Sequence, residues 1–380
     1  MVAAVALVCA ACGTSTIGNA GNGDTAPTAA NRAYAGPGPY AAGTARVTLA
    51  DGDAAQLWYP VDPAAVAGRA PYVARAASWL PGALASEPAL SPFGEGVPTD
   101  SWEGVPPAAA DGQRFPAVLY AHTTAGTPEE ATFLTDHLAS WGFVVLAPDF
   151  RTWDLAAALT PEAAGSTTTV APASASVDEL TTALGYLTSA DTDPTSILHD
   201  RLDLGRVGVV GFGSGGGDAL SLAAEDPAVA TYVALAPTTV STSEVRVPGL
   251  VAYGSRDLVV TPASVQELWA GLPTPKRLVV VSSAGHNVFD DVCTVGTGSR
   301  RLVAELQAAH GSEELVDLAG LDVDGCLAPD VDPVAVRPLV LQVTTAQLRA
   351  GLGIDGRAVG LDDGLDHAFP GVDVSYYEKR

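Results

Sequence analysis

The stretch that decides the fold reads Arg206-Val-Gly-Val-Val-Gly-Phe-Gly-Ser-Gly-Gly-Gly-Asp218. Its apolar start, residues 206–210, predicts a buried strand, and residues 218–225 predict a helix. A strand, a glycine-rich turn and a helix form the setting in which a G-x-S-x-G motif presents a serine nucleophile. The position of the serine within this turn therefore decides which chemistry the chain can perform.

The sequence allows two alignments of this turn with the G-x-S-x-G motif. Counting from Gly211 places Gly213 at the nucleophile position and leaves Ser214 one residue late. Glycine adopts the strained positive φ of such a turn easily, which favours Gly213 at the apex. In the other register Ser214 is the nucleophile, Phe212 packs beside the turn, and the N–H of Gly215 stabilises the oxyanion.

The rest of the chain alternates apolar strands with helices. Further strands are expected at residues 45–49, 55–59, 116–121, 143–147, 231–236, 250–253 and 277–281. Two capping boxes, Thr127-Pro-Glu-Glu130 and Ser176-Val-Asp-Glu179, are expected to open helices, and another helix is expected at residues 263–271. Apolar strands alternating with helices predict a single α/β domain over residues 41–380, with a mostly parallel central sheet and helices on both faces.

Two titratable residues follow late strands of this sheet. Asp257 comes after residues 250–253, and His286 comes after residues 277–281. Open α/β sheets bind their ligands at this carboxyl edge. The order nucleophile, acid, base fits a catalytic triad, in which Asp257 orients the imidazole of His286 and the imidazole moves the proton. A solvated loop aspartate and a surface histidine are the alternative interpretation.

The loop after residues 116–121 reads His122-Thr-Thr-Ala-Gly126. The backbone N–H of Thr123 or Thr124 is the candidate second donor to an oxyanion. An ordinary strand-to-helix loop is the alternative, because every residue except proline offers an N–H group.

Composition narrows the possible partners. The 380 residues carry a formal net charge of -24, which repels phosphate backbones, so no nucleic-acid partner is expected. Hydrophobic residues make up 47% of the chain, enough for a substantial core. No spacing resembles a metal motif and no cofactor is expected; a metal-dependent hydrolase using His122, Asp149 and His286 is a remote alternative.

The N-terminus resembles an export segment. Residues 1–12 are apolar and end at Ala10-Ala11-Cys12-Gly13, which resembles a lipobox with Cys12 as the lipidated residue, although no Lys or Arg precedes Arg32. Residues 13–40, rich in Gly, Asn, Thr, Ala and Pro, predict a disordered tether. We expect an exported protein, either a cell-surface lipoprotein whose lipid anchor is its one membrane contact, or a secreted protein.

Several motifs together support a family resemblance. They include Leu57-Trp-Tyr-Pro60, Phe115-Pro-Ala-Val-Leu-Tyr-Ala-His122, His137-Leu-Ala-Ser-Trp-Gly-Phe-Val-Val-Leu-Ala-Pro-Asp149 and Ala284-Gly-His-Asn-Val-Phe-Asp-Asp-Val-Cys293. The chain resembles the exported bacterial carboxylesterases of the platelet-activating factor acetylhydrolase and dienelactone hydrolase type, in the α/β-hydrolase superfamily. The resemblance implies carboxylic ester hydrolysis, a small-molecule ester or lipid-like ligand, and a Cys293–Cys326 disulfide. Taken alone, these two cysteines could pair in an oxidising compartment or be unrelated buried thiols.

The departures from the family leave two hypotheses. Such esterases read Gly-His-Ser-x-Gly-Gly at the elbow and His-Gly-x-Gly-Gly in the oxyanion loop, so Gly213 aligns with the serine and Thr123 with a glycine. In one hypothesis the chain is an ester hydrolase that uses Ser214, Asp257 and His286. In the other it is a lapsed hydrolase, with Gly213 at the nucleophile position, that acts as a cell-surface binding module.

Overall fold

The computed structural model describes residues 25–80, 82, 86, 96–108, 112–151, 154–158, 173–294 and 324–380. The expectations for the export segment, for Cys12 and for the first half of the tether lie outside these ranges. No helix in the described part of the chain combines the length and the apolar character needed to cross a membrane.

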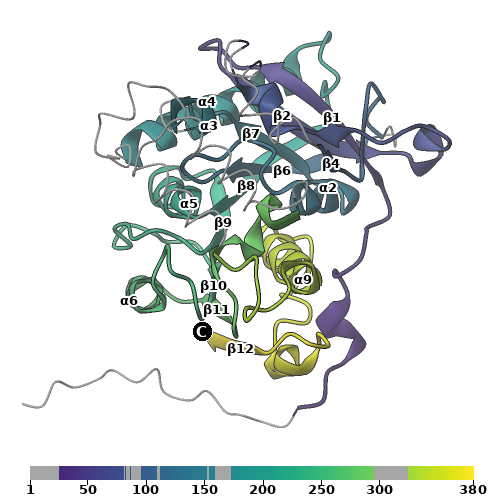
Figure 1. Ribbon diagram of the computed structural model, residues 1–380. Helices are drawn as coiled ribbons and strands as arrows, with labels where there is room; N and C mark the ends of the chain where they lie inside the picture. Colours follow the sequence, from purple (N-terminus) through teal and green to yellow (C-terminus); the bar gives the residue numbers. More distant parts are fainter. Residues whose placement is uncertain are drawn as a thin grey trace, which may run out of the picture.

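A ten-stranded sheet runs through the molecule (Figure 1) in the order β12-β11-β10-β9-β8-β6-β7-β2-β1-β5. Its strands are β1 (Ala41–Thr48), β2 (Ala54–Val61), β5 (Ser101–Glu103), β6 (Phe115–Ala121), β7 (Val144–Pro148), β8 (Leu202–Phe212), β9 (Val229–Leu235), β10 (Gly249–Gly254), β11 (Lys276–Val281) and β12 (Val374–Lys379). The strands β6 to β11 pair in parallel, whereas β2 pairs antiparallel with β1 and β7, and β12 with β11. The predicted mostly parallel sheet is therefore confirmed.

Helices cover both faces of the sheet, as predicted. On one face α4 (Ala173–Thr192), α5 (Ser214–Glu225) and α6 (Pro262–Gly271) share a hydrophobic cluster with the strands. On the other face α2 (Thr132–Ser140) and α9 (Pro333–Gly351) share a second cluster. Successive residues of β6 point to opposite faces, so Leu119 joins the first cluster and its neighbour Tyr120 joins the second.

Shorter elements connect and flank these layers. They are η1 (Ala29–Arg32), η2 (Pro63–Val66), η3 (Ala76–Trp79), α3 (Leu155–Ala158), η6 (His286–Phe289), η7 (Val292–Thr294), η8 (Asp363–His367), and the two-stranded ladder of β3 (Val73–Ala74) and β4 (Val97–Pro98).

Both predicted capping boxes are wrong. The helix α2 begins at Thr132, because the Glu130 carboxyl turns away from the helix end and accepts the N–H of Thr123 at 3.0 Å and the hydroxyl of Tyr120 at 3.0 Å. The helix α4 already begins at Ala173, which places Ser176 inside it. A capping box is a four-residue pattern. At α2 the contacts of Glu130 outside this pattern decide where the helix begins, and at α4 the helix begins before the pattern.

The described second half of the predicted tether packs against the domain. Asn31 is fully buried and donates to the Gly360 carbonyl at 3.0 Å and to Asp362 at 2.7 Å. The Tyr34 N–H donates to Gln342 at 2.7 Å, and the Tyr34 ring meets Trp141 edge-on at 4.8 Å. Figure 1 shows this purple segment beside the yellow C-terminal region. The expectation of disorder is therefore wrong for this half of the segment, because Asn31 and Tyr34 make specific contacts with the folded domain.

We expect Tyr34→Ala to lower the free energy of unfolding by about 3 kcal/mol, since it removes a buried aromatic ring. Tyr34→Phe keeps the ring and loses only the hydroxyl contact, and should cost about 1 kcal/mol. Urea unfolding of the two variants measures both values. Equal stability of Tyr34→Ala and the unchanged protein would show that the segment does not pack in solution.

Candidate active site

The turn between β8 and α5 places Gly213 at its apex. This residue has φ 58 and ψ -120, and Ser214 is already the first residue of the helix. The neighbouring glycines allow the backbone to turn so tightly: a Cβ on Gly211 would overlap the Gly215 carbonyl, and a Cβ on Gly215 would overlap the Ala121 carbonyl. The structure thus has the register that the sequence favours, and Ser214 lies one step past the elbow.

Asp257 and His286 come together as an acid–base pair. The Nδ1 of His286 lies 2.8 Å from the Asp257 carboxylate, and the two side chains are 6% and 0% exposed. The second oxygen of Asp257 accepts the N–H groups of Val259 at 2.9 Å and Val260 at 2.7 Å. With Nδ1–H directed at a fixed carboxylate, Nε2 carries the free lone pair of the imidazole.

The Nε2 atom of His286 faces the apex of the elbow. A Cβ built on Gly213 would lie 3.3 Å from Nε2, a separation that suits a serine hydroxyl in contact with the base. The ring of Phe212 packs on the imidazole with 4.6 Å between the centroids and fixes its orientation. Acid and base are therefore arranged for a nucleophile at position 213, where this chain has no side chain.

Ser214 is engaged elsewhere. Its Oγ accepts the N–H of Thr124 at 2.7 Å and lies 2.9 Å from the Thr124 hydroxyl. The residue is only 8% exposed. The hydroxyl predicted as an off-register nucleophile thus ties α5 to the loop after β6.

The two predicted oxyanion donors of that loop already have acceptors. The Thr124 N–H donates to Ser214, and the Thr123 N–H donates to both oxygens of Glu130 at 3.0 and 3.2 Å. Burial raises the pKa of Glu130 to about 8, although these hydrogen bonds oppose the shift. Neither N–H of the two predicted donors is therefore free to stabilise an oxyanion.

The side chain of Thr123 is a part of the site that was not predicted from the sequence. A Cβ on Gly213 would overlap the Thr123 Oγ1 and would lie 3.0 Å from the Thr123 Cβ. The threonine thus fills the volume that an elbow serine would need. The signal in the sequence is the paired departure from the family pattern, in which glycine stands at the serine position and threonine stands at a glycine position.

His122 supports the loop. Its Nε2 accepts the N–H of Phe150 at 3.1 Å, and its Nδ1 lies 2.8 Å from the Thr123 carbonyl. Burial lowers the pKa of His122 to about 4, so the ring is neutral with Nδ1 as the donor. Both ring nitrogens are used, and nowhere among the described residues do three His, Cys, Asp or Glu side chains gather as metal ligands. The remote metal-dependent alternative gains no support from this arrangement.

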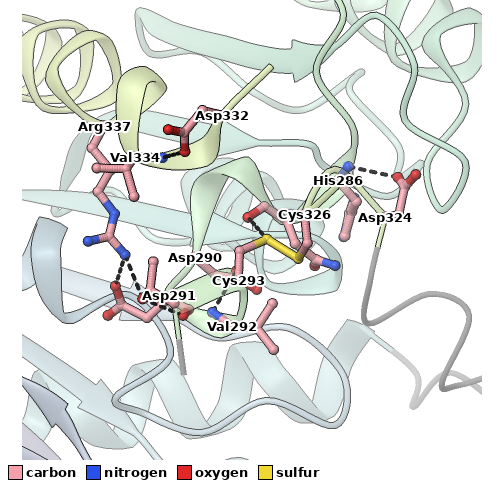
Figure 2. Close-up of a disulfide and its surroundings, with 12 residues drawn as sticks. His286, Asp290, Asp291, Val292, Cys293, Asp324, Cys326, Asp332, Val334 and Arg337 are labelled. Atoms are coloured by element: carbon pink, nitrogen blue, oxygen red, sulfur yellow. Dashed lines mark hydrogen bonds and ion pairs between the residues drawn. A yellow bond between two sulfur atoms is a disulfide. The ribbon is translucent and has the colours of Figure 1, made fainter. Parts of the chain in front are cut away.

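A disulfide lies beside the acid–base pair. Cys293 and Cys326 are bonded, as the resemblance implies, and Figure 2 shows the bond near His286 and Asp324. The Asp324 carboxylate accepts the N–H of His286 at 2.7 Å and the N–H of Leu258 at 3.0 Å. Asp324, which the sequence analysis missed, therefore links the loops that carry the acid and the base.

Comparison with known proteins shows that this chain is similar to ester hydrolases. The profile of a family described as PET hydrolase-like matches residues 107–296, half of the chain. Over 177 residues the chain is 30% identical to a bis(hydroxyethyl) terephthalate hydrolase of Streptomyces coelicolor, covering 45% of this chain and 50% of that protein. It is 27% identical over 177 residues to cutinase est1 of Thermobifida alba, covering 45% of this chain and 53% of that protein. The chain spans about half the length of the curated relatives it matches.

We expect Gly213→Ala to destabilise the fold by about 3 kcal/mol, through positive-φ strain and overlap with Thr123. In a Thr123→Gly background only the strain remains, so the cost should fall to about 1 kcal/mol. A double-mutant cycle by chemical unfolding measures this coupling.

Gly185→Ala is the matched control, since a Cβ there meets no atom within 4 Å. It should be neutral or slightly stabilising, because alanine suits a helix better than glycine. If Gly213→Ala were tolerated equally well, Gly213 would not occupy the strained apex in solution.

Proposed function

Because the chain belongs to the PET hydrolase-like family, which has the α/β-hydrolase fold, we propose that it hydrolyses carboxylic esters with His286 as the base. The predicted resemblance to esterases of this superfamily is confirmed at the level of the family. One observation carries the proposal: the imidazole is held by Asp257 at 2.8 Å and its Nε2 faces the elbow apex. Burying the Asp257 carboxylate costs free energy. A histidine without a catalytic role would give no reason for that cost.

The retained pair defines the proton transfers. Asp257 fixes the tautomer of His286 and stabilises the imidazolium that forms when Nε2 accepts a proton. His286 takes that proton from the attacking hydroxyl and returns it to the oxygen of the departing alcohol. The substrate class is a small-molecule or lipid-like carboxylic ester, in keeping with relatives described as cutinases and a bis(hydroxyethyl) terephthalate hydrolase.

Ser214 has a positioning role in this proposal. Its Oγ accepts the Thr124 N–H at 2.7 Å, which fixes the loop after β6 against α5. An attack by Ser214 would first have to break that contact and turn the hydroxyl toward the apex.

A second candidate function is non-covalent binding of an ester-like ligand by a lapsed hydrolase. It is favoured by the missing side chain of Gly213 together with the internal acceptors of the Thr123 and Thr124 N–H groups. A centre that has no nucleophile at the elbow, and whose loop after β6 offers no free oxyanion donor, would hold a ligand without turning it over.

We expect His286→Gln to lower kcat/KM for p-nitrophenyl butyrate about 100-fold or more, because the general base is lost. Ser214→Ala should stay within about 10-fold of the unchanged full-length chain, since a positioning hydrogen bond contributes less. His199→Gln, which alters a histidine far from Asp257 at the amino end of β8, is the control and should leave the rate unchanged.

Two results decide between the candidates. No hydrolysis above the His286→Gln background would reject the hydrolase and favour the binding module. Loss of all turnover in a folded Ser214→Ala variant would instead restore Ser214 as the nucleophile.

We further propose that the protein is exported and anchored through a lipid on Cys12. The disulfide supports export, because such bonds persist in oxidising compartments. Expression of the full-length chain in an actinobacterial or other bacterial host should place it in the membrane fraction, and Cys12→Ala should release it. Equal membrane association of both forms would contradict the anchor.

A further inference from the structure

The hydroxyl of Thr123 lies beside the point where the side chain of an elbow nucleophile would begin. A Cβ built on Gly213 marks that point, and it would overlap the Thr123 Oγ1 while lying 3.3 Å from the His286 Nε2. One hydroxyl and one base thus flank a single point at the elbow apex. Catalytic hydrogen bonds are often long before the substrate binds, so this arrangement suits a nucleophile and its base.

The surroundings leave this hydroxyl free to react. Thr123 is partly exposed, whereas Ser214 is buried. Within the part of the chain that the structure describes, the Thr123 Oγ1 makes no hydrogen bond, while the Ser214 Oγ meets both the N–H and the hydroxyl of Thr124. The Thr123 hydroxyl is therefore more available for reaction than the Ser214 hydroxyl, although Ser214 is the residue that lies in the glycine-rich turn.

The backbone of Thr123 is held on both sides. Its N–H donates to Glu130 at 3.0 Å, and its carbonyl accepts the Gly126 N–H at 2.9 Å and lies 2.8 Å from the His122 Nδ1. A loop fixed by three such contacts positions its hydroxyl in advance, which is what nucleophilic attack requires.

We propose that Thr123 is the nucleophile, so that the reactive hydroxyl has moved from the elbow to the loop after β6. This inference rests on the proposed ester hydrolysis and names the group that performs its covalent step. Threonine hydroxyls serve as nucleophiles when a neighbouring base removes the proton.

The reaction balances with this chain's own groups and one water. The Thr123 Oγ1 attacks the ester carbonyl carbon while its proton passes to the His286 Nε2. The bond between that carbon and the alkoxy oxygen then breaks, and His286 returns the proton to release the alcohol. Water attacks the resulting acyl-threonine, gives one proton to His286, and the carboxylic acid leaves as the same proton restores the Thr123 hydroxyl.

The oxyanion in this reaction needs donors other than the loop. The helix α5 begins directly after Gly213; the Gly216 N–H donates to the Gly213 carbonyl at 3.1 Å, and the two N–H groups before it have no acceptor within the helix. Those of Ser214 and Gly215 are the donors that we assign, aided by the positive end of the helix dipole.

The test compares Thr123→Val, which keeps the shape but removes the hydroxyl, with Thr123→Ser, which keeps a hydroxyl. Each full-length variant is treated with a fluorophosphonate probe, read by intact mass and peptide mapping, and assayed on p-nitrophenyl butyrate. We expect one adduct on Thr123 in the unchanged chain, its loss in Thr123→Val with a fall in kcat of about 100-fold or more, and retention within about 10-fold in Thr123→Ser. Thermal melts confirm that each variant is folded.

A third variant, Thr123→Gly combined with Gly213→Ser, returns a hydroxyl to the elbow and should carry the adduct at position 213. An adduct on Ser214, or unchanged turnover in Thr123→Val, would overturn the Thr123 inference. An adduct on Ser214 would make Ser214 the attacking group, whereas unchanged turnover in Thr123→Val that still required His286 and gave no adduct would leave ester hydrolysis with water as the attacking group. Absence of turnover in the unchanged chain would overturn both proposals.

Discussion

The close approach of α5 to the end of β8 and to β6 is the constraint on which the site depends. No Cβ fits on Gly211 or Gly215, because carbonyl groups of α5 and β6 occupy that space. The parallel register of β6 and β8, which pairs Ala121 with Gly211, brings the following loop against the first turn of the helix. The elbow, the Thr124–Ser214 contact and the position of Thr123 all follow from this packing. A sheet of the same strands with a wider turn would separate these groups.

The acid and the base are held in place by a different set of contacts, which involves Asp324. Asp257 and His286 follow two adjacent parallel strands, and Asp324 accepts an N–H from each of their loops. The disulfide at Cys326 fixes the chain two residues beyond Asp324. A buried carboxylate that accepts two backbone N–H groups fixes both loops at once, which keeps the imidazole in place even though no side chain at position 213 contacts it. The general base is thus held by contacts that need no side chain at position 213.

Much of this could be predicted from the sequence, and the failures share a cause. The strands, the parallel sheet and the acid–base pair follow from apolar runs and from the edge at which parallel strands end. The Cys293–Cys326 pairing came from the resemblance alone. The capping boxes fail because of contacts of Glu130 and a helical turn that lie just outside the four-residue pattern. The packed segment around Tyr34 and the role of Asp324 depend on partners far along the chain, so local patterns contain none of these contacts. Thr123 was overlooked because a backbone N–H was sought there, and only the three-dimensional overlap with position 213 draws attention to its side chain.

The shared volume of Gly213 and Thr123 also constrains how the chain can evolve. A serine at the elbow would clash with the threonine, because its Cβ would overlap the Thr123 Oγ1. A serine fits at position 213 without this clash once position 123 carries a smaller residue, and a chain with glycine at both positions would have a hydroxyl at neither. The loss of the threonine side chain therefore has to come before the gain of the serine, which fixes the order of the two substitutions.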